Sequence, residues 1–145
     1  MRILVPLDLS DATAPVLAVA RRAAKACGGS IFLLHVAEPD PAFVGYAAGP
    51  EVVREQVAHE YREQHRTLHS LADDLRREEI ETTALLIQGH TAKCILNEAE
   101  RLAADFIVMG THGHGAMFHL IVGSIGHAVI QATTLPVLLV PFRKR

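Results

Sequence analysis

Two patterns of apolar and polar positions alternate along the chain. Short, nearly continuous apolar runs are separated by longer segments in which apolar residues recur at helical spacing. The short runs predict buried strands, and the longer segments predict amphipathic helices. We expect strands at residues 2–7, 30–36, 82–88, 105–110 and 136–141, and helices at 10–29, 51–79, 91–104 and 124–133.

Local signals predict where these elements begin and end. Ser10 or Asp11 is expected to cap the first helix, and Thr91 and Ser124 to cap the last two, because such side chains accept from free backbone N–H groups. A Gly-Gly pair at residues 28–29 predicts the end of the first helix. Prolines and glycines in residues 37–50 predict a surface loop.

The alternation of strands and helices predicts an α/β fold. All-apolar strands joined through helices form a parallel sheet whose two faces are both covered, since the crossovers are right-handed. The economical architecture is an open, doubly wound sheet of five strands in one domain over residues 1–145. Sheets of this kind bind ligands at the carboxyl ends of their strands.

Composition and charge exclude several classes of function. The net charge of −2 does not indicate the excess of positive charge that is typical of nucleic-acid-binding proteins. Cys27 and Cys94 lie far apart without a CxxC motif, which argues against a disulfide framework or a structural metal. The start of the chain lacks the pattern of a signal peptide, and no run is long enough to span a membrane. We therefore expect a soluble, cytoplasmic protein.

The stretch from Asp105 to Ile130 is the candidate functional segment. The glycines at 110, 113 and 115 predict a loop that approaches a ligand closely and adopts positive φ. Gly123 and Ser124 precede a helix, whose free N–H groups and dipole favour an anion. Together they predict a phosphate cradle. Neither GxxxxGK[ST] nor GxGxxG occurs in the chain, so a P-loop mechanism is not supported.

The glycine spacing carries a family resemblance. Gly110-x2-Gly113-x9-Gly123-Ser124 resembles the ATP-binding signature of the universal stress protein family, and "ILVPLDLS", "LLHV", "IVMGTHG" and "PVLLVP" extend the resemblance along the chain. The resemblance implies a flavodoxin-like or Rossmann-like fold, of the adenine nucleotide α-hydrolase-like type, with strand order 3-2-1-4-5. It also implies a stress-response regulator that binds ATP, with AMP or ADP as alternatives, and Mg²⁺ on the phosphates.

The same resemblance implies roles for individual residues. Pro6 and Asp8 are expected beside the ribose and adenine, and the backbone of Val36 at the adenine edge. Asp8 can accept from ribose hydroxyls or hold magnesium, although a capping role at the first helix stays open. Histidine at 114 and glycine at 126 differ from many nucleotide-binding members, and this predicts weaker phosphate binding. The ribose and phosphates are expected to contact Met109, Gly110, Gly113, Gly123, Ser124 and Ile125.

Other functions stay open beside the nucleotide hypothesis. His112, His114, His119 and His127 lie close in sequence and define a rival metal-binding module. The motif from Thr111 to His114 is similar to the [HT]xGH motif of nucleotidylyltransferases, but it follows the fourth strand rather than the first. No candidate base or arginine finger is evident, so at most slow ATP hydrolysis is expected.

The closing strand bears on assembly. "PVLLVP" is apolar on both faces, and an edge strand of this kind leaves backbone groups unpaired unless something covers them. We expect a homodimer through this strand. A dimeric interaction module that binds no nucleotide is a further alternative, and other protein partners are left unidentified by the sequence.

Overall fold

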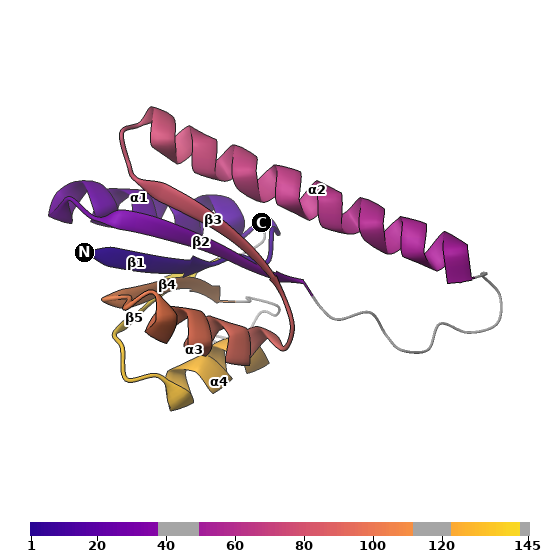
Figure 1. The fold of residues 1–145 in the computed structure, drawn as a ribbon. Helices are drawn as coiled ribbons and strands as arrows, with labels where there is room; N and C mark the ends of the chain where they lie inside the picture. The colour runs from indigo at the N-terminus through magenta and orange to yellow at the C-terminus, as the bar shows by residue number, and fades with distance from the viewer. Residues whose placement is uncertain (38–49, 112–122, 143–145) are drawn as a thin grey trace.

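A computed structural model gives the structure of the chain and describes residues 1–37, 50–111 and 123–142, without the side chains of residues 50–53. Strands and helices alternate from one end of the chain to the other (Figure 1). The strands are β1 (Arg2–Pro6), β2 (Ser30–Ala37), β3 (Thr82–Gln88), β4 (Phe106–Thr111) and β5 (Val137–Pro141). The helices are α1 (Thr13–Cys27), α2 (Pro50–Arg77), α3 (Thr91–Arg101) and α4 (Ser124–Ala132).

The five strands form one parallel sheet in the order β3-β2-β1-β4-β5. This confirms the predicted doubly wound architecture and its strand order. The order reverses at β1, where Ile3 pairs with Ile31 of β2 on one side and with Phe106 of β4 on the other. A crevice forms at such a reversal because the connections after the two central strands run to opposite faces of the sheet.

Each face of the sheet buries its own apolar cluster. Helices α1 and α2 cover one face, and α3 and α4 cover the other (Figure 1). Ile3, Leu33 and Leu68 belong to the first cluster and are fully buried. Leu4, Ile95 and Ile107 belong to the second. Because strand side chains alternate between faces, Ile3 and Leu4 serve opposite cores.

The helix ends correct three predicted caps. Ala12, His90 and Gly123 occupy the N-cap positions of α1, α3 and α4, and none of them makes a side-chain cap hydrogen bond. Thr91 and Ser124 are instead the first residues of their helices. The predicted C-terminal signal of α1 is correct, since a left-handed glycine follows Cys27 and its N–H bonds Ala24.

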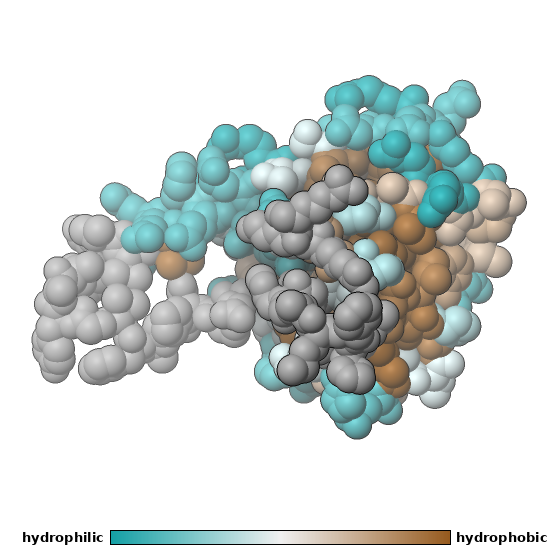
Figure 2. Space-filling model, turned by 180° about the vertical axis from the view of Figure 1, so that it is seen from behind, coloured by the Kyte–Doolittle hydropathy of each residue, from teal (hydrophilic) through white to brown (hydrophobic). Residues whose placement is uncertain are grey.

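Several surface features bear on function. Helix α2 continues well past the ends of the strands (Figure 1). Strand β5 lies at an edge of the sheet, where Leu138 is 44% exposed. Figure 2 shows a broad hydrophobic area on one side of the molecule. Among the described helices, none is long and apolar enough to cross a membrane.

Candidate functional site

A pocket opens where the strands of the sheet end. The carboxyl ends of β1, β2 and β4 meet the start of α4 around a volume of about 550 Å³. Volumes of this size are typical of sites for small molecules and cofactors. Side chains of α1, α2 and α3 complete the walls, so all four helices contribute.

Most of the residues singled out in the sequence converge on this pocket. Ser124 is exposed and is not one of the lining residues, and Gly113 lies outside the described residues. The contact of each residue with a ligand remains a prediction. The predicted site residues that line the pocket are Pro6, Asp8, Val36, Met109, Gly110, Gly123 and Ile125.

Asp8 lies in a tight turn between β1 and α1. Its Oδ1 atom accepts from the backbone N–H of Ser10 at 3.0 Å and from the Ser10 hydroxyl at 2.7 Å. The intervening Leu9 has a φ of 58°, a left-handed conformation that costs a non-glycine residue about 1 kcal/mol or more. The turn therefore fixes the carboxylate at the pocket rim and does not cap α1 directly.

Gly110 provides space and does not provide an unusual backbone angle. Among the described glycines, positive φ occurs at Gly28 and Gly89, so the prediction for Gly110 is wrong on this point. A Cβ atom at Gly110 would lie 3.2 Å from the side chain of Val16 on α1. The missing side chain thus lets α1 pack closely against β4 beside the pocket.

The start of α4 provides the donors for an anion. Gly123 has extended backbone angles, and its carbonyl accepts the first helical bond from His127 at 2.9 Å. The N–H groups of the first turn have no partner within a helix and carry its positive dipole end. Ile125 and Gly126 of this turn line the pocket.

The charges around the pocket limit its chemistry. Its described lining contains no lysine or arginine, and the carboxylates of Asp8 and Glu60 make it acidic. A phosphate would depend there on backbone N–H groups, which agrees with weak phosphate binding. The described residues hold no group of three or more potential metal ligands. Of the four histidines proposed as metal ligands, only the exposed His127 lies within the described part of the chain.

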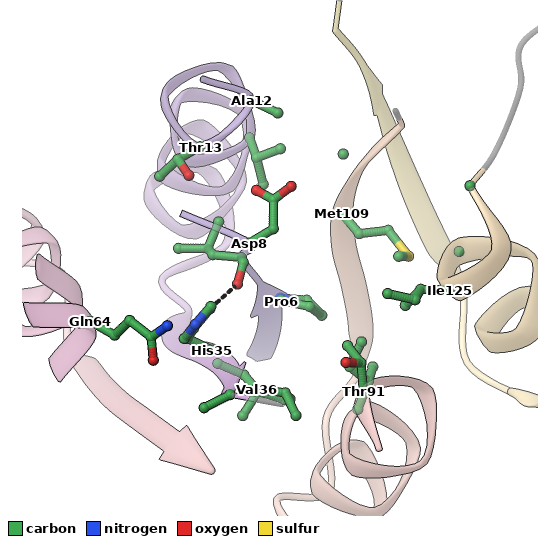
Figure 3. A pocket seen from close by; sticks show the side chains of 18 of the residues that line it. Pro6, Asp8, Ala12, Thr13, His35, Val36, Gln64, Thr91, Met109 and Ile125 are labelled. Carbon is green, nitrogen blue, oxygen red and sulfur yellow. Dashed lines mark hydrogen bonds between the residues drawn. The ribbon is translucent and has the colours of Figure 1, made fainter. Parts of the chain in front are cut away.

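His35 is a pocket residue that the sequence reasoning missed. It follows buried leucines in β2 and is only 8% exposed. Its Nδ1 atom lies 2.7 Å from the carbonyl oxygen of Leu7. In Figure 3, His35 and Gln64 lie on one side of Pro6 and Asp8, and Thr91, Met109 and Ile125 lie on the other side. A polar residue inside the apolar string "LLHV" is the signal that points to it.

Comparison with known proteins identifies the family. The model of the universal stress protein family matches residues 1–141. A universal stress protein of Thermus aquaticus is 36% identical over 138 residues, which cover 95% of this chain and 96% of the relative. A structure from this family in Burkholderia pseudomallei has a TM-score of 0.74 at 22% identity and covers 97% of this chain and 96% of its own.

A further solved structure carries a ligand. The universal stress protein from Archaeoglobus fulgidus in complex with dAMP has a TM-score of 0.65 at 24% identity, with 97% of each chain covered. These likenesses agree with the fold and strand order described above. The match over nearly the whole chain shows that this protein belongs to the universal stress protein family.

Proposed function

We propose that this universal stress protein binds an adenine nucleotide in the pocket at the carboxyl edge of its sheet. The observation that carries the proposal is the convergence of strand ends and the α4 N-terminus on one pocket, lined by seven of the nine residues predicted from the sequence. A relative with the same fold forms a complex with dAMP. The pocket volume of about 550 Å³ suits a nucleotide.

The residues present fit the parts of a nucleotide. Pro6 and Val36 offer apolar contacts for the base, Asp8 offers acceptors for ribose hydroxyls, and Met109 lines the pocket beside the ribose and phosphates. The first turn of α4 offers N–H groups to a phosphate. Magnesium would neutralise phosphate charge, and the Asp8 carboxylate is the kind of oxygen ligand that it prefers. The ligand is ATP with Mg²⁺, or AMP or ADP in its place.

Binding is proposed rather than rapid turnover. Phosphoryl transfer depends on groups that neutralise developing charge, chiefly lysine, arginine and metal ions. No lysine or arginine occurs in the described lining of the pocket. We propose that the protein acts as a stress-response regulator in the cytoplasm, where the nucleotide alters its interaction with protein partners, and that any ATP hydrolysis is slow.

The test is a calorimetric titration of nucleotide-stripped protein with AMP, ADP and ATP, the last with magnesium. Gly123→Glu should abolish binding, because its carboxylate would enter the phosphate site, and the extended angles at Gly123 accept any residue. Gln131→Glu is the matched control, since it adds the same charge to an exposed position of α4. Absence of binding by the wild type, or equal affinity in Gly123→Glu, would contradict the proposal.

We also propose a homodimer through β5. This edge strand exposes Leu138, and pairing with a second copy would satisfy its free backbone groups. Light scattering of the wild type at micromolar concentration should give twice the chain mass, and Leu138→Glu should give the monomer. Thr83→Glu is the control, because it places the charge on the opposite edge strand, β3. A monomeric wild type would refute the dimer.

A further inference from the structure

Two buried polar atoms in the wall of the pocket lack partners. The Nε2 atom of His35 and the Oγ1 atom of Thr13 have no hydrogen-bond partner among the residues that the structure describes. Both residues line the pocket. An unsatisfied buried polar atom costs about 1–3 kcal/mol, and most buried polar atoms in folded proteins do have partners. Their shared position points to a ligand group that completes them.

The bond to Leu7 determines what His35 can accept. A backbone carbonyl only accepts hydrogen bonds, so the proton of the neutral ring resides on Nδ1, 2.7 Å from the Leu7 oxygen. The Nε2 atom then carries a lone pair and needs an N–H or O–H donor. Because His35 lines the pocket and no described residue supplies this donor, a molecule bound in the pocket is the candidate source.

His35 lies between the two positions proposed to hold the nucleoside. It directly precedes Val36 in β2, and it bonds the carbonyl of Leu7, the residue before Asp8. His35, Val36 and Asp8 all line the pocket. Figure 3 shows His35 beside Pro6 and Asp8 in the pocket wall.

We propose that His35 is a specificity-determining residue for the nucleotide, whose Nε2 atom accepts a hydrogen bond from a donor of the adenine nucleoside. This inference rests on the proposed function. The shared chemistry is an N–H or O–H donor, and its two sources are the exocyclic amino group and a ribose hydroxyl. Sites that hydrogen-bond such a group discriminate strongly against analogues that lack it, because a buried acceptor is then left unpaired.

Gln64 is the competing donor within the protein. It lines the same pocket from α2, and its side chain extends toward His35 in Figure 3. In the structure, Gln64 forms no hydrogen bond with Nε2 of His35. If Gln64 completes His35, loss of Nε2 changes stability and leaves ligand selectivity intact. The two accounts therefore predict different results for the same variant.

The experiment uses three analogues and two variants of the full chain. Purine riboside 5′-monophosphate lacks the amino group, and dAMP and 3′-deoxyAMP each lack one ribose hydroxyl. His35→Asn keeps a donor for the Leu7 carbonyl and removes the Nε2 acceptor. His35→Gln is the matched control, because its amide oxygen reaches the Nε2 position while the bond to Leu7 is lost. Dissociation constants are measured by calorimetry for AMP and for each analogue.

We expect wild-type protein to bind AMP about tenfold or more tightly than the analogue that lacks the donor for His35. That ratio should fall to about one in His35→Asn and return in His35→Gln, whatever the melting temperatures of the two variants. The analogue that shows the ratio identifies the amino group or the hydroxyl as the source.

A second measurement does not depend on the variants. The ¹⁵N resonance of His35 Nε2 in wild-type protein should shift on addition of AMP, and less with the discriminated analogue. Unchanged selectivity in His35→Asn, or a resonance that AMP does not move, overturns the inference while nucleotide binding stands. Failure of the wild type to bind any adenine nucleotide overturns the proposed function as well.

Discussion

The polar groups at the two ends of the parallel sheet differ in their hydrogen bonding. At the amino end, backbone groups form hydrogen bonds with neighbouring segments of the chain. The N–H of Arg2 donates to Asp105 Oδ2 at 2.6 Å, and the N–H of Asp105 donates back to the Arg2 carbonyl at 2.8 Å. The N–H of Ser30 reaches the Met1 carbonyl at 2.9 Å. This end is a closed, hydrogen-bonded structure.

At the carboxyl end the same strands leave polar groups open. His35 and Thr13 each have a buried atom without a partner among the described residues, and Leu9 adopts a left-handed backbone conformation. The first turn of α4, whose N–H groups have no partner within a helix, lines the same pocket. The third such buried atom among the described residues, Nε of Arg21, lies on α1 outside the pocket lining. The named backbone groups at the amino end are thus paired, whereas two of the three buried atoms without a partner lie at the pocket. Variants at the two ends should separate stability from binding.

The largest effect on stability is expected from Gly29→Ala at the amino end. A Cβ atom there would lie 2.8 Å from the backbone oxygen of Met1 and 3.2 Å from the sulfur of Cys27. The backbone at Met1 or at residue 29 must shift to relieve this contact, so the free energy of unfolding should fall by about 1–3 kcal/mol. Urea denaturation measures this change, and AMP affinity should stay at the wild-type value.

A double variant shows which contact matters at Gly29. Cys27→Ala removes the flexible sulfur and leaves the backbone oxygen of Met1 in place. The loss of stability from Gly29→Ala should therefore persist in the Cys27→Ala background. Full rescue there would mean that the sulfur, and not the close backbone packing at the amino end, is the obstacle.

A smaller effect, on ligand binding and not on stability, is expected from Asp8→Asn at the carboxyl end. The amide oxygen can still accept both bonds from Ser10, so the turn and the free energy of unfolding should be preserved. The loss of the charged acceptor should weaken AMP binding about tenfold, as measured by calorimetry. If stability fell while the affinity for AMP stayed unchanged, Asp8 would be a structural residue of the turn. That result would contradict the difference proposed between the two ends of the sheet.

The smallest effect concerns pH at the amino end. The hydrogen bond from Lys25 lowers the pKa of Glu78 below its ordinary value of 4.5, with Arg21 adding to this through its charge. A lowered folded-state pKa stabilises above the unfolded value and is lost as the pH falls through the folded one. The stability difference between wild type and Glu78→Gln should therefore be present at pH 7 and shrink below about pH 4.5.

Urea denaturation at several pH values gives this difference, which salt should screen because the pair is exposed. Arg101→Gln serves as a control, since its partner Glu98 lies on α3 and is separate from Glu78. If the stability difference between wild type and Glu78→Gln grew toward low pH, the pairing of Glu78 with Lys25 would be refuted. AMP affinity should not respond to Glu78→Gln, because this residue lies at the end of the sheet away from the pocket.

The sheet and most of the candidate site could be predicted because both depend on patterns that a sequence displays directly. Apolar runs such as that from Ile3 to Val5 have no stable alternative to burial, and their alternation with amphipathic segments dictates a parallel sheet. The topology then brings the ends of β1, β2 and β4 to one edge. Residues adjacent to those ends, such as Asp8 and Val36, could therefore be chosen from the chain alone.

The parts that could not be predicted depend on contacts between distant segments. The partner of His35 is a carbonyl 28 residues earlier, and no periodicity reveals such a bond. The predicted cap of α1 failed because α1 begins only at Thr13, and the Ser10 hydroxyl accepts from the N–H of Ala12, which precedes the helix. The role of Gly110 likewise follows from the approach of Val16 on α1, a consequence of helix packing.

The central position of β1 has a consequence for synthesis on the ribosome. This strand emerges before the other four and can pair with β2 as soon as Ile31 is available, but its other side waits for Phe106 of β4. Domains are synthesised far more slowly than local structure forms, so the β1-β2-β3 half can assemble while the second half is still being translated. The pocket includes residues of β4 and α4, so the lining is complete only after Gly126 of α4 has emerged.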